Sequence, residues 1–124
     1  MEQKFLKCEH CGNIVAVVKD SKVPVVCCGQ KMTHLVPGAV EASVEKHLPT
    51  YKFNGETLEV SVGSILHPME EKHYITFISL VTDDKVIRVD LKPGVEPVVR
   101  LPYVQNADIY EYCNLHGLWK STVE

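Results

Sequence analysis

Four of the five cysteines lie within the first 36 residues, and this feature constrains the fold more than any other. Cys8 and Cys11 are separated by two residues, whereas Cys27 and Cys28 are adjacent. A segment of this length buries little apolar area, so it needs a metal ion or disulfide bonds to fold. Four thiolates suit a tetrahedral metal site. We therefore predict that a metal ion organises residues 1–36.

The cysteine spacing alone leaves zinc and iron equally open as the metal. The adjacent pair must splay apart to bind one ion, which predicts a distorted tetrahedron. A disulfide between Cys27 and Cys28 is disfavoured, because neighbouring cysteines close a strained ring and we expect a reducing compartment. We expect His10, inside the first cysteine loop, and His34, which has no partner motif, to be surface residues rather than ligands.

A second group of metal-binding residue types follows in the rest of the chain. It comprises His47, His67, His73 and the motif Cys113-x-x-His116. A gap of two residues lets a thiolate and an imidazole from one turn bind the same ion. Four imidazoles and one thiolate exceed a closed tetrahedral zinc site, so the group favours iron or another redox metal with one open position.

Residues 37–124 have the pattern of a β protein. Val36 to Ala39 is typical of a linker. Beyond it, short segments alternate with period two or are rich in β-branched residues, turn signals separate them, and no helical period is sustained. We predict strands near residues 57–62, 73–81, 85–91, 98–101 and 109–112. The pattern predicts a mainly β fold in which a small metal-bound module precedes a β-sandwich.

Charge and hydropathy exclude several classes of function. The net charge is −3, with no basic field to attract nucleic acid. Apolar runs are too short to cross a bilayer, so we expect no membrane association. The first residues show no signal peptide, and we expect a cytoplasmic protein. Any attraction for a small anion must then come from a local cationic patch.

The motifs together resemble desulfoferrodoxin, the two-iron form of superoxide reductase, over nearly the whole chain from about Phe5 to Trp119. Their order and the chain length both match that family. The pieces that carry the resemblance are Cys8-x-x-Cys11-Gly12-Asn13, Cys27-Cys28-Gly29, Glu45-Lys46-His47-x-Pro49, Val62-Gly63-Ser64, His67-Pro68-Met69, Glu71-Lys72-His73 and Cys113-Asn114-x-His116-Gly117-x-Trp119.

The resemblance implies two iron centres in two domains. Residues 1–36 would form a desulforedoxin-like module with iron on the four cysteines. Residues 37–124 would form an immunoglobulin-like β-sandwich whose iron has four equatorial imidazoles, from His47, His67, His73 and His116. Cys113 would be the axial ligand, and the sixth position would face solvent and bind superoxide. The resemblance also implies a homodimer and a rubredoxin-like electron donor.

The predicted activity is the one-electron reduction of superoxide to hydrogen peroxide. Lys46 supplies a cation that steers the anion or positions a proton-carrying water. Glu45 is a candidate sixth ligand of the ferric site. Both residues also have a simpler interpretation as solvated surface charges. Two other functions stay open from the sequence: an electron carrier with iron–sulfur ligation, and a zinc-knuckle binding module without catalysis.

Overall fold

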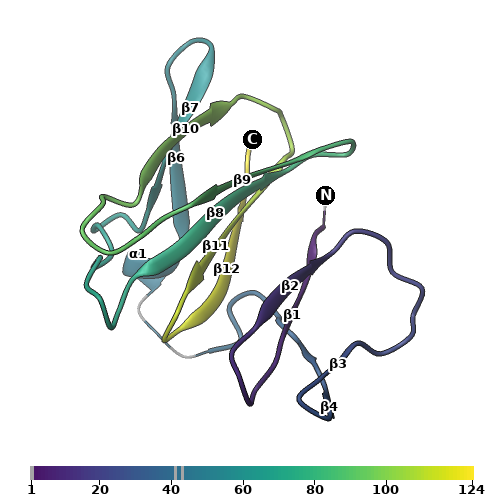
Figure 1. Ribbon diagram of the computed structural model, residues 1–124. Helices are drawn as coiled ribbons and strands as arrows, with labels where there is room; N and C mark the ends of the chain where they lie inside the picture. Colours follow the sequence, from purple (N-terminus) through teal and green to yellow (C-terminus); the bar gives the residue numbers. More distant parts are fainter. Residues whose placement is uncertain (1, 41, 43) are drawn as a thin grey trace. The chain divides into compact units, whose positions relative to one another are not determined.

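The computed structural model describes residues 2–40, 42 and 44–124. It divides into two compact units, Glu2–Val36 and Pro37–Glu124. Both are built from short strands, and the larger unit also contains the short helix α1 (Figure 1). No helix in the described part of the chain is long and apolar enough to span a membrane.

The small unit is a pair of minimal sheets. In the first sheet, β1 (Lys4–Lys7) pairs antiparallel with β2 (Ile14–Val17) on one side and β5 (Thr33–His34) on the other. In the second, β3 (Val26–Cys27) pairs with β4 (Gln30–Lys31).

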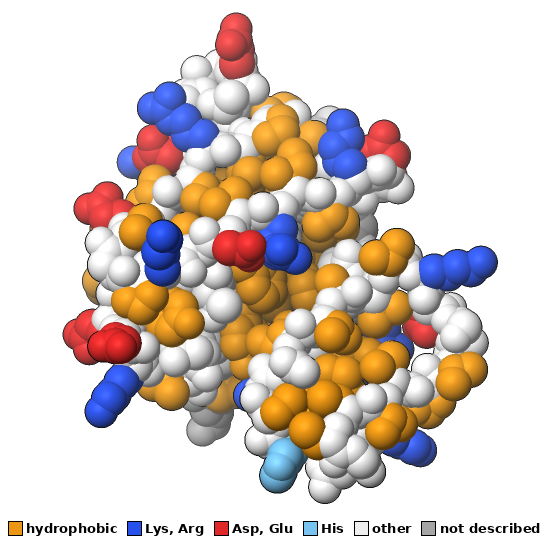
Figure 2. Space-filling view, viewed as in Figure 1, with side chains coloured by type: hydrophobic (Ala, Val, Ile, Leu, Met, Phe, Trp, Pro, Cys, Tyr) orange, Lys and Arg blue, Asp and Glu red, His pale blue; other side chains and the backbone are white. Residues whose placement is uncertain are grey.

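The small unit has almost no apolar core. Among its described residues, only Phe5, Leu6 and Cys8 are buried. Hydrophobic side chains instead gather on its surface in Figure 2, and Val18 is fully exposed. Burial of an apolar side chain contributes about 1.5–3 kcal/mol, so this unit obtains little of its stability from a core.

In the described residues of the large unit, α1 (Val44–His47) is followed by seven strands in two antiparallel sheets. One sheet has the order β10-β7-β6, with β6 Pro49–Phe53, β7 Thr57–Val62 and β10 Val98–Pro102. The other has the order β12-β11-β8-β9, with β8 Ile75–Val81, β9 Val86–Asp90, β11 Asp108–Cys113 and β12 Gly117–Thr122.

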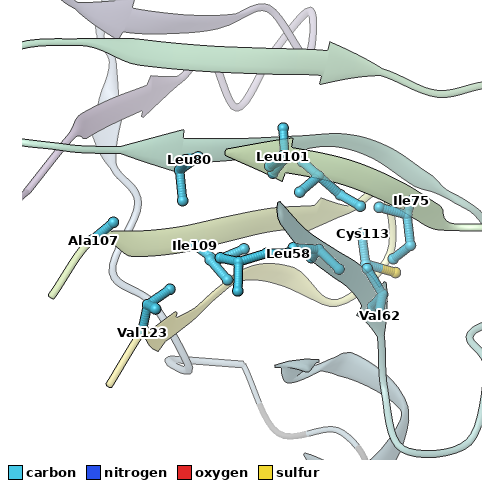
Figure 3. Packing of buried hydrophobic residues seen from close by; sticks show 11 residues of the cluster. Leu58, Val62, Ile75, Leu80, Leu101, Ala107, Ile109, Cys113 and Val123 are labelled. Carbon is cyan, nitrogen blue, oxygen red and sulfur yellow. The ribbon is translucent and has the colours of Figure 1, made fainter. Parts of the chain in front are cut away.

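The core of the large unit lies between its two sheets. Alternate residues of β7 (Leu58, Val60 and Val62) are fully buried and meet apolar side chains of β8, β10 and β11. Figure 3 shows Cys113 at one end of this cluster, with its sulfur beside Val62 and Ile75. The strands therefore place the candidate ligand Cys113 at the edge of a well-packed core.

The mainly β class predicted from the sequence is confirmed, and the alternating segment 57–62 is a strand over its whole length. The patterns did not predict β6 or β12. β6 begins with Pro49 and β12 with Gly117, and neither strand shows the period-two alternation of a half-buried strand. They are strands because β7 and β11 pair with them along their length.

Candidate metal centres

The five residues of the histidine–cysteine group come together in the large unit. One ligand atom from each lies within 4.8 Å of all the others. His47 ends α1, His67 and His73 lie between β7 and β8, Cys113 ends β11, and His116 precedes β12. The strands thus bring to one place residues that are up to 69 positions apart in sequence.

The four imidazoles form a ring in the order His47, His67, His73, His116. Neighbouring ring centroids are 4.6–5.0 Å apart and neighbouring planes are steeply inclined, at 74–83°. The centroids of the two opposite imidazoles, His47 and His73, are 6.4 Å apart, and their planes are inclined by 28°. Four imidazoles in a square therefore face a common centre.

The nitrogen positions fit a metal ion. His47 Nε2 lies 3.0 Å from His116 Nδ1 and 3.1 Å from His67 Nε2. Two nitrogens held at right angles, each about 2.1 Å from one ion, are about 3.0 Å apart. His73 Nε2 is buried and has no hydrogen-bond partner among the described residues, as expected for an atom that faces a metal.

The imidazole of His67 is prepared for binding a cation. Its Nδ1 lies 2.7 Å from the carbonyl oxygen of Pro68 and donates to it, which leaves the lone pair on Nε2 facing the other ligands. Burial lowers the pKa of His67 to about 4, so the ring is neutral at neutral pH. Burial also lowers the pKa of His73, and the nearby charges of His116 and Lys46 lower it further.

Trp119 supports two of the ligands. Its indole stacks on the ring of His47 with 5.3 Å between centroids, and its Nε1–H donates to the carbonyl oxygen of His116 at 3.1 Å. The side chain is buried. Trp119 therefore holds one ligand through its ring and another through its backbone.

A β-bulge aims the thiol of Cys113. The pairing of β11 with β8 shifts register between Tyr112 and Cys113, so that Cys113 lies opposite Ile75. Burial raises the pKa of the Cys113 thiol. A bound cation is needed to offset that cost and hold the thiolate.

Glu111 lies two residues before Cys113 and is fully buried. Neither of its carboxyl oxygens has a hydrogen-bond partner among the described residues. Burial raises the pKa of Glu111 to about 9, so the carboxyl group is protonated at neutral pH. Near the thiol, the core thus holds an uncharged acid rather than a second negative charge.

The turn after β7 anchors α1. Gly63 has φ of 82°, and a Cβ there would lie 2.6 Å from the carbonyl oxygen of Lys46 and 2.7 Å from that of Glu45. Ser64 Oγ and the Ile65 amide both donate to the Glu45 carbonyl, each at 3.3 Å. Only glycine permits this close approach, which fixes the backbone that presents Glu45, Lys46 and His47.

The four cysteines of the small unit form the second group of possible ligands. Their sulfur atoms lie within 4.8 Å of one another, and all four cysteines are free thiols rather than disulfides. The amide of Cys11 donates to Cys8 Sγ at 3.4 Å, and Cys28 has φ of 53°. This left-handed residue lets the adjacent cysteines Cys27 and Cys28 turn toward one ion.

Proton affinities at this site indicate that a cation is needed. Hydrogen bonding from the Cys11 backbone lowers the pKa of Cys8 to about 6. Hydrogen bonding with the thiols of Cys11 and Cys8 raises the pKa of Cys28 to about 12. Four thiolates at these distances repel one another, so a bound cation is required to ionise them all.

Two family models match this chain. The desulfoferrodoxin model matches residues 39–122, and the model of the desulfoferrodoxin N-terminal domain matches residues 1–35. The chain belongs to the desulfoferrodoxin family. The desulfoferrodoxin of Syntrophotalea carbinolica is 45% identical over 93% of this chain and 92% of its own length. That of Nitratidesulfovibrio vulgaris is 40% identical over 97% and 96%.

Solved structures agree with this family. The superoxide reductase of Treponema pallidum is similar over 98% of this chain and 99% of its own, with a TM-score of 0.76 and 28% identity. The one-iron superoxide reductase of Giardia intestinalis is similar over 64% of this chain and 98% of its own, with a TM-score of 0.55 and 32% identity. The two groups of donors in this chain fit the two predicted iron centres.

The two ligand groups contain the nine residues that the sequence singled out. His10 and His34 are exposed and belong to neither group. Gly63, Asn114 and Trp119 lie within the sequence motifs, but the sequence alone indicated no role for them. Their roles depend on contacts with residues far away in the chain, which spacing within a motif cannot show.

Proposed function

We propose that this chain is a superoxide reductase that adds one electron and two protons to superoxide and releases hydrogen peroxide. The observation that carries the proposal is the square of four imidazoles beside one buried thiol, in a chain of the desulfoferrodoxin family. Five donors leave one of six positions at an iron ion open to a substrate. An electron carrier does not need an open coordination position. A zinc knuckle does not need a fifth donor.

His47, His67, His73, His116 and Cys113 are the proposed ligands of the catalytic iron, and Cys8, Cys11, Cys27 and Cys28 those of the first iron. Ferrous iron supplies the single electron. Four neutral imidazoles and one thiolate leave a net charge of +1 at the ferrous site, which favours an anionic substrate. The low pKa of His67 keeps this ligand neutral at neutral pH.

Lys46 is the proposed cation that guides superoxide toward the iron. It is exposed, and it lies directly before His47 on α1. Its positive charge contributes to lowering the pKa of His73, after burial and the charge of His116. The ammonium group can attract the anion and donate a hydrogen bond to a water that carries the proton. Glu45, also exposed beside it, is the proposed carboxylate that closes the oxidised site.

We further propose that a rubredoxin-like protein supplies electrons to the large unit. Exposed apolar side chains adjoin three of the proposed ligands in sequence: Leu48 follows His47, Leu66 precedes His67 and Leu115 precedes His116. Ile65, next to Leu66, is also exposed. A small apolar surface around a redox centre suits a short-lived contact with an electron-transfer protein.

The proposed domains are residues 1–36 and 37–124, and we propose that the protein is a homodimer. We also propose that it is cytoplasmic, because free thiols suit a reducing compartment.

The decisive experiment is the stoichiometry of the reaction. The reduced full-length protein is exposed to superoxide generated by pulse radiolysis, and hydrogen peroxide and oxygen are both measured. A reductase forms one peroxide for each superoxide consumed and releases no oxygen. A dismutase forms half as much peroxide and releases oxygen. Oxygen release, or no reaction faster than spontaneous dismutation, would overturn the proposal.

A further inference from the structure

Three of the four imidazoles have a visible local support. His67 is held by its hydrogen bond to the Pro68 carbonyl, His47 by the stacked indole of Trp119, and His116 by the indole N–H on its carbonyl. His73 differs from them. Its buried Nε2 has no hydrogen-bond partner among the described residues.

The hydrogen bonds that fix His73 run through the backbone. Its own amide and carbonyl exchange hydrogen bonds with Glu70, at 3.1 and 2.9 Å, in an isolated bridge. Glu70 is exposed, and the loop that contains both residues lies outside the named strands. The placement of the His73 ring therefore depends on what holds the peptide groups on either side of it.

Asn114 holds both of those peptide groups. Its Oδ1 accepts the amide hydrogen of Tyr74 at 2.9 Å, and its Nδ2 donates to the carbonyl oxygen of Lys72 at 3.0 Å. The backbone amide of Asn114 also donates to the Tyr74 carbonyl at 3.2 Å. One side-chain amide thus closes a clamp around His73.

We propose that Asn114 is a positioning residue that fixes His73 for metal binding. This inference rests on the proposed function, because it requires His73, Cys113 and His116 to be ligands of one ion. Asn114 directly follows Cys113 and precedes His116 by two residues. Its clamp therefore connects the segment with the thiolate and one imidazole to the loop with another imidazole.

The chemistry of the amide explains why asparagine is required. The clamp needs one acceptor for Tyr74 N–H and one donor for the Lys72 carbonyl, at a fixed separation. Aspartate keeps the acceptor, but it places a second oxygen against the Lys72 carbonyl. Alanine removes both bonds. Groups that orient metal ligands from outside typically change metal affinity by about 10–100-fold when they are removed.

Cobalt(II) binding tests the inference without relying on activity. The full chain is prepared with zinc in the four-cysteine site, and cobalt is titrated into the histidine–cysteine site against a competing chelator. The sulfur-to-cobalt absorption band reports occupancy. We expect Asn114→Ala to weaken cobalt binding by about 10–100-fold, and Asn114→Asp to weaken it less. Hydrogen exchange at the Tyr74 amide should become faster in Asn114→Ala.

Asn54→Ala is the matched control. Asn54 Oδ1 accepts hydrogen bonds from the amide and hydroxyl of Thr57 in the turn between β6 and β7, so this variant also loses two side-chain hydrogen bonds. We expect its cobalt affinity to equal that of the wild type. If Asn114→Ala fails to fold, the cobalt affinity of Asn114→Asp tests the inference instead, because this variant keeps the hydrogen bond to the Tyr74 amide.

A double-mutant cycle with His73→Ala separates this inference from the proposed function. If Asn114 acts through His73, Asn114→Ala should not lower the cobalt affinity further in a protein that already carries His73→Ala. An equal loss of affinity in both backgrounds, or an unchanged affinity in Asn114→Ala, would overturn the inference. If His73→Ala alone leaves cobalt binding unchanged, the ligand set is wrong and the proposed function fails with it.

Discussion

In the small unit, three of the described residues are buried, whereas eleven buried residues form one cluster between the sheets of the large unit. Both units hold a group of metal donors, but they support it differently. In the small unit, two short loops present the buried thiol of Cys8 and three thiols that are exposed or half-buried. In the large unit, strand ends and loops around the core present four imidazoles and a thiol. A metal ion therefore contributes to folding in the first case, and occupies a largely prepared site in the second.

Metal removal should show this difference most clearly. In the metal-free full chain, we expect the amides of residues 2–36 to lose nearly all protection from hydrogen exchange, because metal binding and folding are coupled in a unit with almost no apolar core. The strands of the large unit should stay protected. Hydrogen exchange with mass spectrometry on the loaded and metal-free protein measures both. Retained protection in residues 2–36 would show that the small unit folds without its metal.

Cys113→Ser should strongly slow the chemistry of the large unit without unfolding it. Serine fits the space of the thiol but is a hard and weakly donating ligand. We expect loss of the sulfur-to-iron absorption band and a fall of at least about tenfold in the rate with superoxide. Circular dichroism should still show the β-sandwich. Wild-type activity with full iron occupancy would contradict a role for the thiolate.

Lys46→Ile should have a several-fold effect, and it tests whether local charge matters in a chain of net charge −3. A lysine within a Debye length of the iron, about 8–10 Å at moderate salt, raises the encounter rate of an anion. An interaction of about 1 kcal/mol corresponds to about a fivefold change in rate.

The salt dependence provides the control for Lys46. The wild-type rate should fall as salt rises, the Lys46→Ile rate should change less, and Lys46→Arg should keep most of the rate. Pulse radiolysis over a salt series measures all three proteins. Equal rates for Lys46→Ile and wild type at every salt concentration would show that Lys46 is a solvated surface residue with no role in guiding superoxide.

Cys27→Ser should have the smallest effect on the reaction with superoxide. It removes one thiolate of the first site, so the ferric–thiolate absorption of the small unit should disappear. The second-order rate of the reduced large unit with superoxide should keep most of its wild-type value. A collapse of that rate with the histidine–cysteine site fully loaded would mean that the first iron takes part in the chemistry.

The sequence by itself determined the donors and the fold class. Cys8-x-x-Cys11 and Cys113-x-x-His116 are local motifs, because two side chains of one turn can bind the same ion. The alternation of residues 57–62 is also local, because successive side chains of a strand point to opposite faces. Such features depend on neighbours in the chain, and they can be read without knowing what lies across the sheet.

Only the tertiary structure decided how those donors are held. The stacking of Trp119 on His47, the approach of Gly63 to the Glu45 and Lys46 carbonyls, and the clamp of Asn114 around His73 each join residues at least 17 positions apart. The bulge that aims Cys113 depends on the register with β8. These contacts arise when the sheets pair and pack, and a sequence pattern confined to a few neighbouring residues does not contain them.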